Sequence, residues 1–267
     1  MLKYVRILLT AGWSVLHNFI WYIWRWAKHP EKTPLEVRYK RIRKLIIKVT
    51  NAFHIDWKKE GMEHLRSLER QDKRFLLVAN HMSMFDPLAC IYWSEKPITF
   101  VAKKEAEKFP FIGAAMKALD GQFLDRDNLR QGVQVIKKIE EYISTGYCSV
   151  VIYPEGTRNR NPEGPLPPFH PGTFKPAFRV NCPILPLAIY GTHRPFSTKM
   201  QWKRFPVEFV YQAPIDSSSF AADETTTTLA DRIHDAVEAD LIREREMDAD
   251  FLKKGYEKVP LKKGLLR

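Results

Sequence analysis

The chain has 267 residues, of which 45% are hydrophobic and 28% charged. This balance excludes a disordered protein and allows one large domain with an appendage. The 43 Lys and Arg residues against 31 Asp and Glu residues give a net charge of +12, which predicts an anionic partner. Membrane phosphates, nucleic acid and acidic proteins all satisfy that expectation, so charge alone does not choose between them.

Three widely spaced cysteines, Cys90, Cys148 and Cys182, occur without any Cys-x-x-Cys pair. Their odd number and spacing predict neither a disulfide framework nor a metal site. A reducing compartment that faces the cytosol is therefore expected.

The first 26 residues hold four of the seven tryptophans, and no charged residue occurs between Arg6 and Arg25. Trp favours the boundary between water and lipid. The uncharged run is close to the minimum length for a membrane span, but Ser14, His17 and Asn18 interrupt it. Whether this helix spans a bilayer or lies flat in its surface stays open. No small-residue cleavage site follows, which weakens a signal-peptide interpretation.

A second helix is expected from Leu35 to about Phe53, after the break between Pro30 and Pro34. Apolar residues recur on it at helical spacing, and basic residues crowd the remaining surface: Arg38, Lys40, Arg41, Arg43, Lys44 and Lys48. A basic amphipathic helix of this kind can lie in a membrane interface. The alternative is a helix packed on the core with a solvated charged face. Beside its Trp-rich neighbour, residues 1–55 are interpreted as a two-helix membrane anchor.

From residue 56 to 252, short apolar runs alternate with helical patterns. Strands are predicted at Phe75–Ala79, Ile98–Ala102, Gln122–Leu124, Ser149–Tyr153, Ile184–Tyr190 and Val207–Tyr211. Helices are predicted at Gly61–Arg70, Pro87–Ser94, Phe111–Leu119, Leu129–Thr145, Thr173–Val180 and Thr228–Phe251. This alternation predicts an α/β domain with a central, largely parallel sheet flanked by helices. Residues 253–267 form a short basic tail.

A strand-to-helix loop carries the first chemically informative segment, Asn80-His81-Met82-Ser83-Met84-Phe85-Asp86-Pro87. Residues five apart on a regular helix would point away from each other. Pro87 favours the first helical position, which makes Asp86 the expected N-cap and leaves the loop free to fold His81 onto Asp86. A carboxylate on one imidazole nitrogen would leave the other free to deprotonate an alcohol. On spacing alone, a plain helix cap beside a loop histidine is the favoured interpretation.

A second loop reads Tyr153-Pro154-Glu155-Gly156-Thr157-Arg158-Asn159-Arg160, again directly after an apolar strand. Gly156 permits close backbone approach, and Arg158 offers a planar fork that can grip a phosphate. By itself the segment is also compatible with an exposed polar turn.

Together these segments resemble the glycerolipid acyltransferases typified by 1-acylglycerol-3-phosphate acyltransferases. That family carries His-x4-Asp in its first block and Glu-Gly-Thr-Arg in its third. The intermediate block resembles Phe100-Val101-Ala102-Lys103-Lys104-Glu105 with Phe109-Pro110-Phe111-Ile112-Gly113, followed by Phe123-Leu124-Asp125-Arg126. The fourth block resembles Cys182-Pro183-Ile184-Leu185-Pro186-Leu187-Ala188-Ile189. Four blocks in order over about residues 75–190 are far more specific than any one of them.

The resemblance implies direct acyl transfer from a thioester, acyl-ACP or acyl-CoA, to the sn-2 hydroxyl of lysophosphatidic acid, which gives phosphatidic acid. It implies His81 as general base and Asp86 as the residue that orients it. It places the acceptor phosphate against a set of five residues, Lys103, Glu155, Gly156, Thr157 and Arg158, with Arg126 as a further candidate. Glu155 is awkward beside a phosphate, and orienting Arg158 or tying the loop down suits it better. No resident cofactor, metal or nucleic-acid partner is expected.

Other functions are weighed against this one. A serine esterase would need a nucleophile, but Gly-x-Ser-x-Gly is absent and Ser83 is the only serine of the His81 loop. A basic membrane-binding module would explain the net positive charge, but it would not explain why the four motif blocks occur in order. Glycerol 3-phosphate or another lysophospholipid could replace the acceptor. The expected location is the cytoplasmic face of the cell membrane, reached through the N-terminal helices in a monotopic or peripheral manner.

Overall fold

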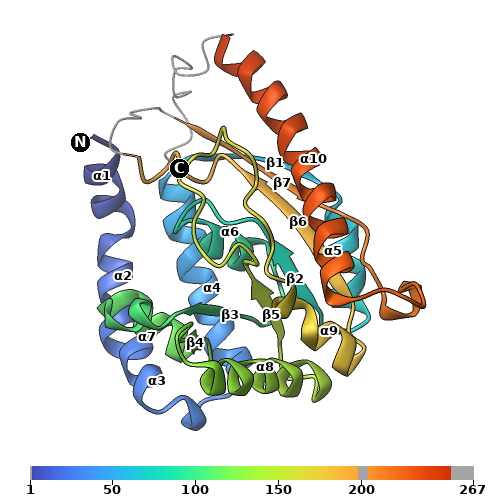
Figure 1. Ribbon diagram of the computed structural model, residues 1–267. Coiled ribbons are helices and arrows are strands. Elements are labelled where there is room, and N and C mark those ends of the chain that lie inside the picture. Colours follow the sequence, from blue (N-terminus) through green and yellow to red (C-terminus); the bar gives the residue numbers. More distant parts are fainter. Residues whose placement is uncertain (1, 198–203, 254–267) are drawn as a thin grey trace.

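The computed structural model describes residues 2–197 and 204–253, which form a seven-stranded sheet surrounded by helices (Figure 1). The strands are β1 Ile55–Glu60, β2 Leu76–Ala79, β3 Ile98–Lys103, β4 Gln122–Leu124, β5 Ser149–Ile152, β6 Ile184–Tyr190 and β7 Phe205–Tyr211. Their order is β1-β7-β6-β2-β5-β3-β4, and every neighbouring pair is parallel except β6 and β7. The largely parallel sheet predicted from the sequence is thus confirmed.

The helices of this region are α5 Met62–Arg70, α6 Asp86–Trp93, α7 Pro110–Ala118, α8 Leu129–Ser144, α9 Lys175–Val180 and α10 Thr226–Lys253. All six predicted strands and all six predicted helices occur, and each begins and ends within two residues of its predicted bounds. Apart from Lys253, the predicted basic tail lies outside the described residues.

Strand β1 was not predicted. Its sequence holds two acidic residues and two lysines among six positions, so it lacks the apolar run that identified the other strands. It lies at the edge of the sheet and pairs in parallel with β7, and none of its residues is buried. A criterion based on buried apolar runs does not predict an edge strand whose side chains are polar.

Helices cover both faces of the sheet. The ring of Phe209 on β7 packs against Trp57, which in turn stacks with Tyr92 of α6. The adjacent residue Glu208 points to the opposite face, where the charge of Asp248 on α10 acts on it. Figure 1 shows α10 lying over β6 and β7, with α4 and α6 on the far side.

Residues 2–28 form a continuous helical run made of α1 Leu2–Ile7, α2 Trp13–Asn18 and α3 Trp24–Lys28, joined by two π-helical turns at Leu8–Gly12 and Phe19–Ile23. After a 3₁₀ turn, α4 Leu35–Ala52 runs back alongside it (Figure 1). Within residues 2–197 and 204–253, no helix combines the length and apolarity that a bilayer crossing requires.

Helix α4 is packed on the core of the α/β domain. Leu35, Tyr39, Ile42 and Ile46 are buried in the same apolar cluster as the central strands. The Tyr39 hydroxyl donates to the carbonyl of Ser94, 3.1 Å away, directly after α6. Of the two interpretations of this helix, the structure supports packing on the core.

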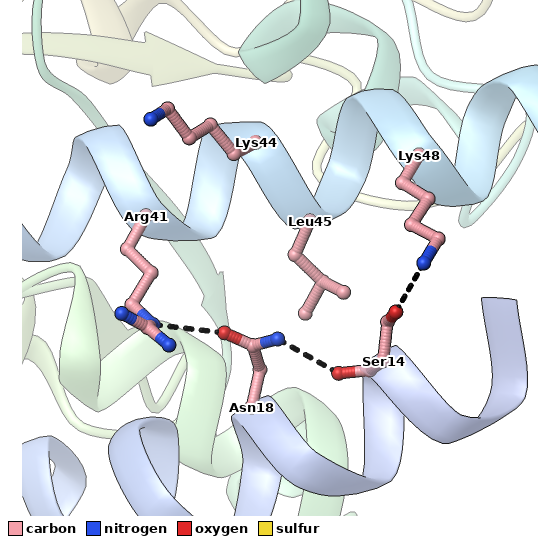
Figure 2. A pocket seen from close by; sticks show the side chains of 6 residues that line it. All are labelled: Ser14, Asn18, Arg41, Lys44, Leu45 and Lys48. Carbon is pink, nitrogen blue, oxygen red and sulfur yellow. Dashed lines mark hydrogen bonds between the residues drawn. The ribbon is translucent and has the colours of Figure 1, made fainter.

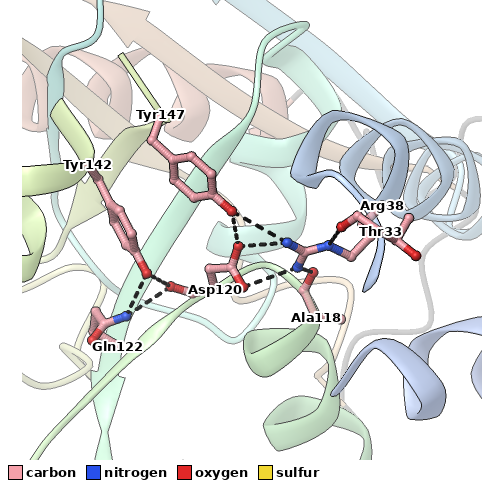
Figure 3. Close-up of polar contacts among 7 residues, drawn as sticks. All are labelled: Thr33, Arg38, Ala118, Asp120, Gln122, Tyr142 and Tyr147. Atoms are coloured by element: carbon pink, nitrogen blue, oxygen red, sulfur yellow. Dashed lines mark hydrogen bonds and ion pairs between the residues drawn. The ribbon is translucent and has the colours of Figure 1, made fainter. Parts of the chain in front are cut away.

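The expectation that every basic residue of α4 lies on its surface is wrong for Arg38, which is 2% exposed. Its Nη2 lies 2.7 Å from Asp120 Oδ2, and its Nε donates to the carbonyl of Thr33 (Figure 3). Asp120 also accepts a hydrogen bond from the Tyr147 hydroxyl. A buried guanidinium needs such partners, because an unpaired buried charge is strongly destabilising. The network joins α4 to the connection between α7 and β4.

Candidate active site

Two loops meet at the carboxyl edge of the sheet. Strands β2 and β5 are parallel neighbours near its centre, with Val78 opposite Ile152. The loop after β2 carries His81, and the loop after β5 carries Glu155 and Arg158. In sheets of this kind, ligands bind outside the carboxyl ends of the strands, where loops from neighbouring strands converge.

His81 and Asp86 contact each other directly. The Nδ1 atom of His81 lies 2.6 Å from Oδ2 of Asp86, which is fully buried. The same oxygen accepts the backbone N–H groups of Met82 and Ser83, both at 2.9 Å. The carboxylate is therefore fixed by three hydrogen bonds, and the imidazole is fixed through it.

Asp86 is not the N-cap that the sequence predicted. Phe85 occupies that position and Asp86 is the first residue of α6, with no side-chain cap on the helix. The carboxylate turns back to the preceding loop, because the N–H groups of Met82 and Ser83 point at it. The predicted pairing with His81 thus holds although the predicted cap does not.

The contact determines which nitrogen of His81 is available. A carboxylate only accepts hydrogen bonds, so Nδ1 donates in this contact, and in the neutral imidazole Nε2 is then the nitrogen with the lone pair. The ring stacks on Tyr153 of the second loop, with centroids 4.2 Å apart and planes 20° from parallel. The side chain remains 19% exposed, so Nε2 belongs to a ring that solvent still reaches.

Asn80 anchors the start of the His81 loop. Its Nδ2 donates to the carbonyl of Ile189 at 2.9 Å, and its Oδ1 accepts the N–H of Ile189 at 2.7 Å. The amide thereby continues the pairing of β2 with β6 beyond the last residue of the strand. The sequence motif contains Asn80 but indicates no role for it, because this contact is made with the neighbouring strand β6.

Glu155 joins the two loops. Its carboxylate accepts the backbone N–H of His81, and the carbonyl of His81 accepts the N–H of Asn159 at 2.7 Å. Glu155 is 4% exposed, and burial raises its pKa to about 8. Of the two roles expected instead of phosphate contact, tying the loop down matches the structure. The side-chain hydrogen bond of Glu155 goes to the His81 backbone, and no ion pair joins Glu155 to Arg158 within residues 2–197 and 204–253. Glu155 thus ties the His81 loop to the second loop, and its predicted place among the phosphate ligands stays a prediction.

Gly156 adopts a φ of +67°, in the left-handed region that favours glycine. A Cβ atom at this position would lie 2.6 Å from Nη2 of Arg126, so the guanidinium of Arg126 rests directly on the glycine. Arg126 follows β4, at the far edge of the sheet. The structure thus brings this weaker sequence candidate to the same loop as Arg158.

Three cationic side chains near the two loops are exposed: Lys103 at the end of β3, Arg126, and Arg158. None of them forms a side-chain hydrogen bond or ion pair with residues 2–197 or 204–253. Lys104 differs, because its Nζ lies 3.0 Å from Asp125. Thr157 is also exposed. These side chains are free to receive an anion.

Two further residues bear on the site. Ser83 is 6% exposed and its hydroxyl accepts the N–H of Phe85, which does not suit a nucleophile. His193 follows β6, the other neighbour of β2, and burial lowers its pKa to about 4. His193 is therefore neutral near pH 7. No sequence motif includes His193, so sequence patterns do not identify it.

A model of the protein family described as Acyltransferase matches residues 56–190, half of the chain. The chain belongs to this acyltransferase family. The matched segment begins in β1 and ends with β6, so it contains His81, Asp86 and the loop of residues 153–160. Helices α4 and α10 of this acyltransferase lie outside it, as does His193.

Individual proteins resemble this acyltransferase over most of its length. The 1-acyl-sn-glycerol-3-phosphate acyltransferase of Haemophilus influenzae is 29% identical over 185 residues, which are 69% of this chain and 74% of that protein. The probable 1-acyl-sn-glycerol-3-phosphate acyltransferase of Mycoplasma pneumoniae is 29% identical over 204 residues, 72% of this chain and 73% of that protein.

A solved structure shares the fold. The 1-acyl-sn-glycerophosphate (LPA) acyltransferase of Thermotoga maritima superposes with a TM-score of 0.64 at 23% identity. The superposition covers 91% of this chain and 95% of that chain, so it extends beyond the family match to the N-terminal helices or to α10.

Proposed function

We propose that this acyltransferase moves an acyl chain from a thioester to the sn-2 hydroxyl of 1-acylglycerol 3-phosphate, which gives phosphatidic acid for phospholipid synthesis. The observation that carries the proposal is the 2.6 Å contact between His81 Nδ1 and Asp86 Oδ2 at the carboxyl edge of the sheet. The names of the similar proteins from Haemophilus influenzae and Mycoplasma pneumoniae support the choice of acceptor.

In the proposed reaction, Nε2 of His81 removes the proton from the acceptor hydroxyl as its oxygen attacks the thioester carbonyl carbon. The new C–O bond forms, the tetrahedral intermediate collapses, and the C–S bond breaks. The imidazolium returns its proton to the departing thiolate. Asp86 stabilises the imidazolium and holds the tautomer, and no acyl-enzyme forms.

The acceptor phosphate is proposed to bind Lys103 and Arg158, with Arg126 as a third cation. Their exposed and unpartnered side chains support this assignment. Gly156 allows the backbone and the Arg126 guanidinium to approach closely, and Thr157 can donate a hydrogen bond beside them. Anchoring the phosphate sets the position of the hydroxyl relative to Nε2, and such positioning contributes strongly to rate.

The thioester donor is proposed to be acyl-ACP or acyl-CoA. An acidic carrier protein and the nucleotide of coenzyme A are both anionic, so the net charge of +12 suits either. Thiol release measured with each donor distinguishes acyl-ACP from acyl-CoA.

Association with the cytoplasmic face of the membrane is proposed to use the exposed apolar side chains of the N-terminal helical run. Leu9 is 79% and Trp13 75% exposed. The apolar surface continues onto α7, where Phe111 is 55% exposed and its ring lies 4.3 Å from that of Phe19. Large exposed apolar surfaces of this kind mark interaction sites, and Trp favours the membrane interface.

Thiol release from acyl-ACP and acyl-CoA, measured with the purified full chain, tests the reaction. The acceptor panel contains 1-acylglycerol 3-phosphate, glycerol 3-phosphate and lysophosphatidylcholine. We expect 1-acylglycerol 3-phosphate to give the highest kcat/KM and a diacyl product. A higher kcat/KM with another acceptor would show that 1-acylglycerol 3-phosphate is not the preferred substrate. Absence of acceptor-dependent thiol release would support a membrane-binding module instead.

The membrane proposal needs substitutions rather than removal of residues 1–55, because α4 belongs to the core. Leu9→Glu with Trp13→Glu should move the protein from the membrane pellet to the supernatant on sedimentation. An unchanged distribution would contradict this surface.

A further inference from the structure

A groove lies between the N-terminal helical run and α4, and none of its lining residues belongs to the loops that carry His81 and Arg158. It has a volume of about 300 Å³ and is lined by Ser14, Asn18, Arg41, Lys44, Leu45 and Lys48. Figure 2 shows Arg41 and Lys48 reaching toward Asn18 and Ser14, with Leu45 between them. Half of the lining residues are cationic and none is acidic.

Polar contacts join the two helices at both ends of the groove. Nε of Arg41 donates to Oδ1 of Asn18 at 2.9 Å, and its guanidinium lies 3.2 Å from the centroid of the Tyr22 ring. Lys48 donates to the hydroxyl of Ser14. Asn18 in turn donates to the carbonyl of Ser14 at 2.8 Å. The terminal nitrogens of Arg41 form no hydrogen bond or ion pair with residues 2–197 or 204–253, so they remain able to donate.

The positive charge of the groove is not compensated. Arg41, Lys44 and Lys48 are spaced three and four residues apart, which places them on one face of α4. None of the three forms an ion pair with a described residue. Arg38 on the same helix shows the contrast, since its guanidinium is paired with Asp120. Three neighbouring cations repel one another, and a bound anion would relieve that repulsion.

We propose that this groove binds the phosphate of an anionic phospholipid from the bilayer surface, at a site separate from the acceptor site. The three cations and the hydroxyl and amide of Ser14 and Asn18 supply the donors that a phosphate needs. Basic pockets between helices near a membrane recognise lipid headgroups in this way.

A lipid is favoured over free phosphate because the same helix presents apolar side chains beside the groove. Trp13, next to Ser14, is 75% exposed, and Leu16 and Trp21 are also exposed. Acyl chains can lie along these residues while the headgroup sits in the groove. Leu45 adds an apolar floor. Such a site would hold the enzyme at a fixed depth and orientation, in addition to general attraction by net charge.

Sedimentation with vesicles tests the site. The full chain is mixed with vesicles of phosphatidylcholine alone or with phosphatidylglycerol added, and Lys44→Gln and Lys48→Gln are compared with Lys40→Gln. Lys40 is a matched control because it is exposed on the same helix and does not line the groove. We expect each groove variant to lose about fivefold in affinity for the anionic vesicles and Lys40→Gln to lose less than twofold. Equal losses in all three variants would mean diffuse attraction and would overturn the site, as would no loss in the groove variants.

One further measurement distinguishes a lipid phosphate from free phosphate, and a second distinguishes this groove from the proposed acceptor site. Sodium phosphate at the ionic strength of a chloride control should leave the difference between groove and control variants intact. Its disappearance in phosphate would identify a free-anion site and overturn the lipid assignment.

Thiol release by the double variant Lys44→Gln with Lys48→Gln, measured in detergent, should stay within twofold of the unsubstituted chain. A larger loss would place these lysines in the acceptor site and contradict a separate one.

Discussion

The His81 loop and the cations around it are built in opposite ways. In the loop, Asp86 holds the imidazole, Asn80 clamps the end of β2 to β6, and Glu155 holds the backbone of His81. Lys103, Arg126 and Arg158 are exposed and form no polar side-chain contact with the described part of the chain. The groups proposed to react are fixed in advance, whereas those proposed to bind are left for the substrate to order.

This difference has an energetic reason. A general base works only within hydrogen-bond reach of its proton, so its position tolerates little error. A cation that paired with a protein carboxylate would have to break that pair before it could bind a phosphate. Substitutions in the fixed region should therefore change kcat, and substitutions among the free cations should change acceptor binding.

His81→Ala is expected to have the largest effect, a loss of about a hundred- to ten-thousand-fold in kcat with acceptor binding largely kept. Thiol release measures the rate, and equilibrium binding of the acceptor measures affinity. His29→Ala is a suitable control, because His29 is 57% exposed in the N-terminal segment. If His81→Ala kept more than a tenth of the activity, the general base would be another residue.

Asp86→Asn should lower kcat by about ten- to a thousandfold. His81, Met82 and Ser83 all contact the same Asp86 oxygen, so an amide oxygen in its place can still accept from all three, but it carries no negative charge and stabilises the imidazolium less. The acceptor KM should change little, because Asp86 is fully buried. A variant with full kcat would show that the carboxylate serves only the loop.

Arg158→Ala should raise the acceptor KM by about ten- to a hundredfold, the range for losing a hydrogen bond to a charged group, and should lower kcat to a smaller extent. The melting temperature should not change, since the side chain is exposed and unpartnered in the described structure. Arg160→Ala, an exposed arginine of the same loop, is the matched control. Equal effects of the two substitutions would indicate net charge and not a phosphate contact.

Glu155→Gln tests the fixed region through stability. Burial raises the pKa of Glu155 from 4.5 to about 8, so folding favours the protonated carboxyl. Its contribution to the free energy of unfolding is complete below about pH 4.5 and is lost as pH rises to about 8. Glutamine does not titrate. The melting temperature of the variant relative to the unsubstituted chain should therefore rise between pH 5 and 8, by about 2–4 °C for each kcal/mol. A difference in melting temperature between the two proteins that does not change with pH would mean that Glu155 is ionised throughout this pH range.

Helix α4 shows how far sequence patterns reach. The apolar spacing of Leu35, Ile42 and Ile46 predicted the helix and its bounds to one residue. The pattern could not tell whether its apolar face meets lipid or protein, because both bury the same residues. Nor could it predict that Arg38 pairs with Asp120, which is 82 residues away in the chain.

The sequence by itself determined the alternation of strands and helices and the loops that follow β2 and β5, because each of these depends on residues close together in the chain. The pairing of His81 with Asp86 was expected only from the family resemblance, since spacing alone also allowed a plain helix cap. Only the tertiary structure decided which atoms the Asp86 and Glu155 carboxylates face, and that Arg126 rests on Gly156. Those contacts arise where strands distant in sequence become neighbours in the sheet, and no local pattern encodes that meeting.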